Sequence, residues 1–290
     1  MFIIFCLFRK RVNDSFLWYD IKSRNFKDEG KTNMLRGLYT AAGAMNALQR
    51  QQEILSNNLG NVRTPGFKAS NGVVRSFPEL LLAEVSHPGN DRSRVQGEVG
   101  TLSTGVYLQE TMPRFSAGSI TATDSPTDVY LKVPADFTGA AMFAVEQNGE
   151  ALYTTNGRFS VDDERFLRSA DGGYILSDAG ERIQLPSSDF ELSGDGQITS
   201  LGQDVATLGA VQIDDLATLE QVGNDYRVNG GANPAVNVQF QQGYIEEANV
   251  DLDRTMADLM VTYRQFEANQ KVVQAYDKSA ERAIEIARIR

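Results

Sequence analysis

Apolar residues recur every seven positions near both ends of this 290-residue chain. Towards the C-terminus two such rows run through a stretch, Tyr244 to Arg290, that contains no Gly or Pro. The first row is Leu252, Leu259, Phe266, Val273, Ala280 and Ala287, and the second is Met256, Tyr263, Gln270, Asp277 and Ile284. The second row has two polar members, beside which Tyr276 and Ala283 can continue the apolar face. Apolar spacing that alternates between three and four residues over several heptads predicts a coiled-coil-type helix.

The N-terminal part of the chain repeats this pattern with polar residues between its apolar positions. One row is Met34, Ala41, Leu48, Leu55 and Val62, and the other is Leu38, Met45, Gln52 and Leu59. The pattern predicts a helix with a narrow apolar stripe. Because matching stripes stand at both ends of one chain, we expect the two helices to pair or to assemble with neighbouring chains.

A turn is expected where the first helix ends. Asn57, Asn58, Gly60 and Asn61 favour left-handed backbone and local capping bonds. Pro65-Gly66 suits the two central positions of a type II turn. The chain therefore leaves the helix abruptly and continues into a different kind of structure.

The middle of the chain is rich in glycine and in short strand-like runs. Asn148-Gly149 is a hairpin signal between Met142–Gln147 and Glu150–Thr155. Further strand-like runs are Val129–Val133, Arg158–Val161, Tyr174–Ser177, Arg182–Leu185, Gln197–Ser200, Thr207–Ile213 and Asp225–Val228. Short strands with close turns predict a compact, mainly antiparallel β domain. Before it, Phe77–Ala83 is expected to form a helical turn or two, and Asp91–Glu98 a loop.

These patterns predict an α+β fold in which long N- and C-terminal helices pair as a coiled-coil-like stalk and enclose an antiparallel β domain. The expected segments are an atypical extension (1–33), an N-terminal helix (34–64), a connecting segment (65–104), a β-rich domain (105–243) and a C-terminal helix (244–290).

The first 33 residues differ in composition from the rest. They hold the only Cys and the only Trp, Cys6 and Trp18, and seven basic against four acidic residues. Eight apolar residues, 1–8, are followed by Arg9-Lys10-Arg11, which reverses the order of a secretory signal and is too short to span a bilayer. We expect translation to begin at Met34; the alternative is a short membrane-touching tail.

Charge and composition exclude several classes of function. The net charge of −10 lacks the basic balance of a nucleic-acid-binding protein. One Cys and one His, His87, cannot build a disulfide or a four-ligand zinc site, and His87 is expected in a surface loop. Asp162, Asp163 and Glu164 could be paired catalytic carboxylates, but a solvated turn is the favoured interpretation. We therefore expect no catalytic, cofactor or metal site, no nucleic-acid partner and no integral membrane span.

Two terminal motifs resemble the bacterial flagellar basal-body rod and hook family. Met34–Tyr39 and Leu55–Lys68, which contains Asn57-Asn58 and Thr64-Pro65-Gly66-Phe67-Lys68, resemble its N-terminal signature. Gln242–Glu246, Ala248–Asp251 and Tyr263–Val273 resemble its last helix, and Tyr153–Phe159 its hairpin. The resemblance covers Met34 to Arg290 and is strongest to distal-rod-like hook-basal body proteins of Gram-positive bacteria, related to FlgF and FlgG. Arg165 departs from it, because a turn glycine is common there.

The resemblance implies a structural subunit of the rod, exported by the flagellar type III apparatus and placed outside the cytoplasm in the cell wall. It implies assembly with itself and with other rod and hook subunits through the terminal helices. Because the apolar surface of these helices lacks partners in an isolated monomer, we expect both ends of the chain to be largely disordered until assembly. The assembly residues so implied are Leu38, Met45, Leu48, Leu55, Leu59, Leu252, Met256, Leu259, Tyr263, Phe266 and Val273. The turn motif comprises Asn57, Asn58, Asn61, Thr64, Gly66 and Phe67.

Two other functions remain open on sequence grounds. One is a secreted coiled-coil stalk that carries a carbohydrate- or peptidoglycan-binding β domain. The other is a secreted adhesin or phage-tail-like part, which would not require the asparagine-rich turn and the last-helix motif to occur together.

Overall fold

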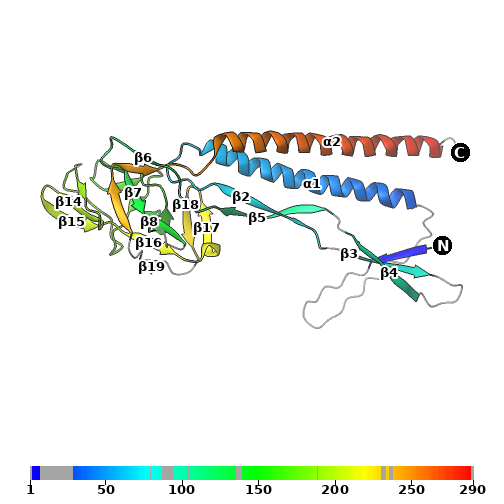
Figure 1. Ribbon diagram of the computed structural model, residues 1–290, viewed down its shortest axis with the longest axis horizontal. Helices are drawn as coiled ribbons and strands as arrows, with labels where there is room; N and C mark the ends of the chain where they lie inside the picture. The colour runs from blue at the N-terminus through cyan, green and yellow to red at the C-terminus, as the bar shows by residue number, and fades with distance from the viewer. Residues whose placement is uncertain are drawn as a thin grey trace. The chain divides into compact units, whose positions relative to one another are not determined.

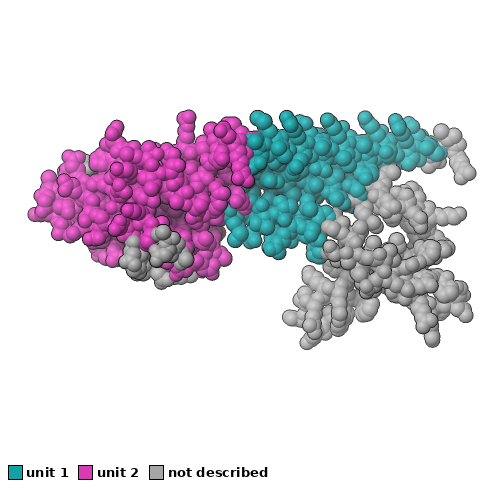
Figure 2. All heavy atoms as spheres, in the orientation of Figure 1, with its two compact units in different colours: residues 1–55, 72–112, 257–290 teal, residues 56–71, 113–256 magenta. Residues whose placement is uncertain are grey.

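A computed structural model describes residues 2–6, 29–78, 80–86, 94–102, 105–134, 139–187, 189–229, 233–234 and 238–288. The chain divides into two units (Figure 2): unit 1 is Met1–Leu55, Gly72–Met112 and Ala257–Arg290, and unit 2 is Ser56–Asn71 and Pro113–Met256. His87, for which a surface loop was expected, lies outside the described residues.

Unit 1 contains most of the two α-helices found in the described residues, together with two small sheets (Figure 1). The helices are α1 (Glu29–Gly60) and α2 (Leu252–Arg288). One antiparallel sheet has the order β1 (Phe2–Cys6), β3 (Leu80–Ser86) and β4 (Arg94–Leu102), and the other pairs β2 (Ser70–Ser76) with β5 (Val106–Pro113). The helical turn expected at Phe77–Ala83 is therefore wrong, and so is the loop expected over the part of Asp91–Glu98 that is described, because both lie largely in strands.

The two-stranded ribbon of β2 and β5 packs closely against α1. A Cβ atom added to Gly72 would lie 2.6 Å from Leu108 Cδ1 and 3.0 Å from Ile54 Cδ1. In the same unit, a Cβ atom on Gly37 of α1 would lie 2.1 Å from the hydroxyl oxygen of Tyr276 in α2. Glycine at these two positions lets neighbouring elements approach the α1 backbone and the ribbon.

The predicted fold class, with long terminal helices pairing as a coiled-coil-like stalk, is wrong. The second predicted row of α2 faces solvent, since Met256, Tyr263 and Ile284 are 41, 53 and 62 % exposed. The buried row of α2 instead contains Thr255 and Thr262, each one position before Met256 and Tyr263. A polar row cannot supply the apolar knobs of a coiled coil, and α1 also uses part of its surface to cover the ribbon. Among the described residues the dominant architecture is a large, mostly antiparallel β domain.

Unit 2 is built on a sheet of nine described strands around β8 (Figure 1). Its order is β10 (Phe159–Val161), β11 (Leu167–Ser169), β12 (Tyr174–Ile175), β8 (Ala140–Gln147), β9 (Glu150–Thr154), β18 (Asp225–Val228) and β17 (Leu219–Val222). Beside this path, β16 (Ala210–Ile213) pairs with β8 and with β19 (Asn233–Pro234). The hairpin expected at Asn148-Gly149 is confirmed by the antiparallel register of β8 and β9.

Smaller sheets and one 3₁₀ turn complete the described part of unit 2. They are β13 (Glu191–Leu192), β14 (Gln197–Ser200) and β15 (Gln203–Thr207), the pair β7 (Val129–Lys132) and β20 (Gln239–Gln242), the pair β6 (Ile120–Ala122) and β21 (Tyr244–Glu246), and η1 (Leu216–Thr218). The strand expected at Arg182–Leu185 is present only as isolated bridges at Arg182 and Gln184.

The core of unit 2 lies on both faces of β8. Successive side chains of a strand point to opposite faces, so Phe143 and Val145 enter one apolar cluster while Ala140 and Met142 enter another. The first cluster also contains Val129, Phe159, Leu167, Ile175, Ile183, Leu185, Phe190, Ile198, Leu208, Ala210 and Phe240. This two-sided core fixes the strands that carry the candidate site.

Candidate functional site

The asparagine-rich turn closes the end of α1 with its own side chains. The Asn61 backbone N–H and its side-chain Nδ2 both donate to the Asn57 carbonyl oxygen, at 3.1 and 3.0 Å. Thr64 donates through its backbone N–H to the Asn61 carbonyl at 3.0 Å and through its hydroxyl to Asn61 Oδ1 at 3.2 Å. The last carbonyl groups of a helix otherwise lack partners, so this turn stabilises the helix end and redirects the chain.

A second part of the motif is a reciprocal bond between Asn58 and Ser70, both of which are buried. Asn58 Nδ2 donates to the Ser70 carbonyl and Asn58 Oδ1 accepts from the Ser70 backbone N–H, each at 2.9 Å. Phe67 lies between them in sequence and is also buried. The side-chain amide therefore makes the pair of hydrogen bonds that a neighbouring strand would otherwise make to the Ser70 backbone, and it holds the start of β2 against the end of α1.

Gly66 occupies a position that only glycine fits. Its φ angle is +69°, and a Cβ atom there would lie 2.2 Å from the carbonyl oxygen of Thr155. The Gly66 N–H donates to the Glu246 carbonyl at 2.7 Å, and the Thr155 hydroxyl donates to the Gly66 carbonyl at 2.6 Å. The turn is thereby joined to two distant parts of the β domain.

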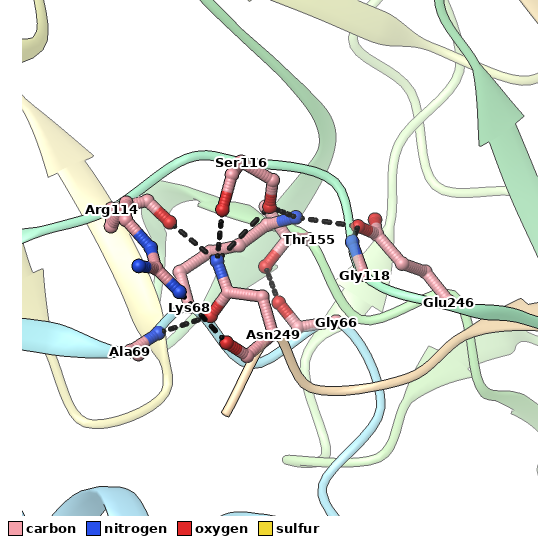
Figure 3. Close-up of polar contacts among 9 residues, drawn as sticks. All are labelled: Gly66, Lys68, Ala69, Arg114, Ser116, Gly118, Thr155, Glu246 and Asn249. Carbon is pink, nitrogen blue, oxygen red and sulfur yellow. Dashed lines mark hydrogen bonds and ion pairs between the residues drawn. The ribbon is translucent and has the colours of Figure 1, made fainter. Parts of the chain in front are cut away.

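Lys68 and Glu246 form a buried ion pair beside Gly66 (Figure 3). Lys68 Nζ lies 2.8 Å from Glu246 Oε1, with only 7 and 16 % of the two side chains exposed. The Gly118 N–H donates to the same oxygen at 2.6 Å, and Lys68 Nζ also donates to the Ser116 carbonyl at 3.4 Å. Nearby, burial raises the pKa of the Tyr130 hydroxyl above its usual range, and the negative charge of Glu246 adds to this effect.

Asn249 uses every polar group of its side chain to connect two other segments (Figure 3). Its Oδ1 accepts from the Ala69 N–H at 2.6 Å, while Nδ2 donates to the carbonyl oxygens of Arg114 and Ser116 at 2.6 and 3.0 Å. The Asn249 backbone N–H donates to the Phe67 carbonyl at 3.3 Å, and Arg114 Nη2 donates to the Asn249 carbonyl at 3.1 Å. We call the nine residues of Figure 3 the polar junction: Gly66, Lys68, Ala69, Arg114, Ser116, Gly118, Thr155, Glu246 and Asn249.

Two residues beyond the junction, the chain enters α2. The Asp251 carboxylate accepts from the Arg254 N–H at 3.1 Å, which is the usual way for an aspartate to cap a helix N-terminus. The Thr255 N–H donates to the Asp251 carbonyl at 2.9 Å and starts the helical ladder. The junction therefore lies where the chain both leaves α1 and enters α2.

The sequence motifs identified only part of this junction. Gly66 was in the predicted turn motif, and Lys68, Glu246 and Asn249 lay in the segments that resembled the family. Thr155, which contributes its hydroxyl, also lay in such a segment, the hairpin Tyr153–Phe159. Arg114, Ser116 and Gly118 were not predicted as site residues, because they contribute mainly backbone groups, which a residue pattern does not reveal.

None of the predicted assembly residues is buried within the single chain. In α1, Leu38, Met45, Leu48, Leu55 and Leu59 are half-buried, and in α2, Leu259, Phe266 and Val273 are half-buried. Leu252, Met256 and Tyr263 are exposed. Apolar side chains that stay partly in water along two helices leave surface that another chain could cover.

The carboxylate cluster considered earlier forms a turn rather than a catalytic pair. Asp162 Oδ1 accepts from the Phe166 N–H at 2.7 Å, and Asp162 Oδ2 accepts from Arg168 Nε at 2.6 Å. Next to it, Arg165 has a φ of +65°, in the left-handed region that favours glycine. The described residues hold no group of three or more His, Cys, Asp or Glu side chains arranged to bind a metal ion. No helix in the described part of the chain is long and apolar enough to cross a membrane.

The polar junction holds the residues that leave α1 and those that enter α2 against the β domain, an arrangement suited to a structural subunit. Three protein-family models match the chain in order. They are "Flagella basal body rod protein" at residues 38–68, "Flagellar hook protein FlgE/F/G D1 domain" at 137–200 and "Flagellar basal body rod FlgEFG protein C-terminal" at 241–286. The chain belongs to the flagellar basal-body rod protein family, whose members are structural proteins and not enzymes.

Several named relatives align with nearly their whole length. The flagellar hook-basal body complex protein FlhO of Bacillus subtilis (strain 168) is 38 % identical, over 86 % of this chain and 97 % of its own. The flagellar basal-body rod protein FlgG of the same organism is 25 % identical over 88 % of this chain and 100 % of its own. The flagellar basal-body rod protein FlgF of Caulobacter vibrioides is 27 % identical over 86 % of this chain and 95 % of its own. These relatives favour the rod subunit over the adhesin and the carbohydrate-binding stalk.

Proposed function

We propose that this protein is a subunit of the distal part of the flagellar rod and that it polymerises through surface on its terminal helices. The supporting observation is that all eleven predicted assembly residues remain half-buried or exposed in the single chain. An interface between subunits would bury about 1,200–2,000 Å² in total, which helices α1 and α2 are long enough to provide. The partners are other copies of the chain and other rod and hook subunits.

Location and delivery form the second part of the proposal. The subunit acts outside the cytoplasm, within the cell wall, and reaches it through the flagellar type III export apparatus. Two features support this route. From Met34 onward the chain has no cysteine, so no wrong disulfide can form after export, and its 21 basic against 34 acidic residues favour solubility of the free subunit.

The gene-deletion experiment tests the role, and point variants test the surface. A deletion strain should lack complete rods and hooks and should not swim, and the wild-type gene should restore both. Tyr263, an assembly residue exposed on α2, is replaced in Tyr263→Glu, and the exposed Gln265 on the opposite face of the same helix gives the matched control Gln265→Glu. We expect the Tyr263→Glu strain not to swim and the Gln265→Glu strain to swim like the wild type.

The two parts of this proposal fail in different ways. Full motility of the deletion strain, in a background without a paralogue, would overturn the rod role. Equal motility with Tyr263→Glu and Gln265→Glu would instead mean that the Tyr263 face of α2 makes no contact in the assembled rod.

A further inference from the structure

A pocket of about 510 Å³ lies in unit 2 and shares no lining residue with the polar junction. Its walls come from the segment before β7, the start of β10 and the residue that follows β11. Most of the lining residues carry hydroxyl or charged groups, among them Ser125, Thr127, Ser160, Asp124, Asp128 and Arg158. A volume of several hundred Å³ is typical of pockets that hold small ligands.

The segment before β7 is held in place by the chain around Gly243. The Thr123 N–H donates to the Gly243 carbonyl and the Gly243 N–H donates to the Asp128 carbonyl, each at 2.8 Å. Between these two points, Gln242 Nε2 donates to the Pro126 carbonyl at 2.6 Å. A wall that is fixed before a ligand arrives loses little conformational freedom on binding.

The carboxylate of Asp128 is poorly satisfied by the protein itself. Only 5 % of this side chain is exposed. Its ion-pair partner among the described residues is Arg158, whose Nε lies 4.0 Å from Asp128 Oδ1, which is too long for a hydrogen bond. Buried polar groups nearly always have hydrogen-bond partners, so the oxygens of Asp128 are available to a donor that enters the pocket.

Thr123 presents a second unsatisfied group in the same wall. Its Oγ1 is buried and has no hydrogen-bond partner in the part of the chain that the structure describes. Folded proteins contain few such groups, and each one calls for an explanation. A ligand that both donates and accepts hydrogen bonds suits a wall of this kind.

The lining favours a sugar over other small ligands. Carboxylates only accept hydrogen bonds, a guanidinium only donates them, and hydroxyls do both, which matches the neighbouring hydroxyls of a sugar ring. Two carboxylates against one guanidinium disfavour an anion. An apolar ligand would find little surface, because Phe159 is only 3 % exposed. The described residues also hold no group of three or more metal-binding side chains.

We propose that this pocket binds a sugar ring of the glycan strands of the cell wall. Hydroxyls of the sugar donate to Asp128, and Arg158 donates to the sugar. The inference rests on the proposed location of the subunit within the cell wall, and it adds a ligand to a structural protein. Such a contact ties the subunit to the wall that surrounds it.

Isothermal titration calorimetry of the purified full chain tests this site. The probe is chitotetraose, four linked N-acetylglucosamine units, which reproduces one of the sugars of the glycan strands. We expect the wild type to bind it and Asp128→Asn to bind it roughly tenfold more weakly or worse, because a hydrogen bond to a charged group is lost. Asp195→Asn changes an exposed aspartate outside the pocket and should bind like the wild type.

A second variant blocks the pocket without removing a charge. Ala170 is an exposed lining residue, so Ala170→Trp should fill part of the pocket and abolish binding. The matched control is Ala179→Trp, at an exposed alanine outside the pocket, which should leave binding unchanged. Circular dichroism checks that each variant is folded.

Several outcomes would overturn the inference. They are a wild type that does not bind chitotetraose at millimolar concentration, and wild-type binding by both Asp128→Asn and Ala170→Trp. If the wild type binds no sugar but Ala170→Trp weakens self-association, the pocket is a contact between subunits instead. Binding of cellotetraose, which lacks the acetamido groups, without binding of chitotetraose would exclude the cell wall as the source of the sugar.

The sugar site and the rod role can fail separately. If the deletion strain is fully motile while the purified chain binds chitotetraose through Asp128, the rod role fails and the site stands. If the deletion strain lacks rods while the purified chain binds no sugar, the rod role stands and the site fails.

Discussion

The buried ion pair of the polar junction gives a prediction whose size follows from the structure. The variant Glu246→Gln removes the negative charge but keeps an oxygen that can accept from the Gly118 N–H. Lys68 then remains with 7 % of its side chain exposed and without the single ion-pair partner that it has among the described residues. A lysine that keeps its charge in such a place has lost the water and the counter-ion that stabilised it.

Removing one partner of a buried ion pair typically costs about 3–5 kcal/mol. We expect the lower end, ~3 kcal/mol, because Lys68 keeps its bond to the Ser116 carbonyl and can still donate to the glutamine oxygen. For a domain of 150–250 residues, each kcal/mol lowers the melting temperature by roughly 2–4 °C, so the decrease should be about 6–12 °C.

Thermal unfolding followed by circular dichroism measures this effect. The matched control is Glu150→Gln, which makes the same chemical change in the exposed pair of Glu150 with Arg227 and should cost less than ~1 kcal/mol. The double variant Lys68→Met/Glu246→Gln leaves no unpaired charge and should be more stable than the sum of the single effects predicts. The reasoning is refuted if Glu246→Gln and Glu150→Gln destabilise equally.

Three further predictions concern other parts of the chain. Gly66→Ala should lower the free energy of unfolding by more than ~3 kcal/mol, because left-handed strain adds to a clash with the Thr155 carbonyl. The control Gly223→Ala, with a φ of +68° and open space around it, should lower it by only ~1–2 kcal/mol. Equal losses in urea unfolding would rule out the clash. Burial raises the pKa of Asp225, whose Oδ1 has no partner among the described residues. A raised folded-state pKa means that stability is lost as pH rises through that pKa. The free energy of unfolding of Asp225→Asn should therefore equal that of the wild type in acid and exceed it by ~1 kcal/mol at neutral pH. A constant difference across pH would contradict this. Limited proteolysis of the monomer should remove both terminal segments before Gly105–Gln241, and equal resistance would show that the ends are ordered without partners.

Sequence patterns located the elements whose signals are local. Asn148-Gly149 predicted a hairpin correctly because few other residues adopt its backbone angles, and β14 and β18 occur at the residues predicted for them. The strands β3 and β4 were missed because their sequences are ambiguous. The apolar run starting near Pro78 suits a helical turn as well as a strand, and so short a run does not separate the two.

Sequence patterns also failed to predict which face of α2 is buried. A seven-residue period gives the spacing of a stripe, but neighbouring residues on a helix differ by only about 100°, so the covered row can shift by one position. Here Thr255 and Thr262 take the place expected for Met256 and Tyr263. Their hydroxyls donate to the carbonyl oxygens of Asp251 and Asp258 at 2.6 and 2.7 Å, which removes most of the penalty for burying them.

The polar junction also determines when the β domain can be completed. The Ala69 N–H binds Asn249 Oδ1 across 180 residues of sequence. At a synthesis rate of about 5–20 residues per second, roughly 10–40 s pass between the emergence of these two residues from the ribosome. During this interval the nascent chain holds Lys68 without Glu246 and β7 without β20. Closure of the domain therefore depends on a residue made 180 positions after Ala69, which delays stable folding of the domain until that residue has emerged.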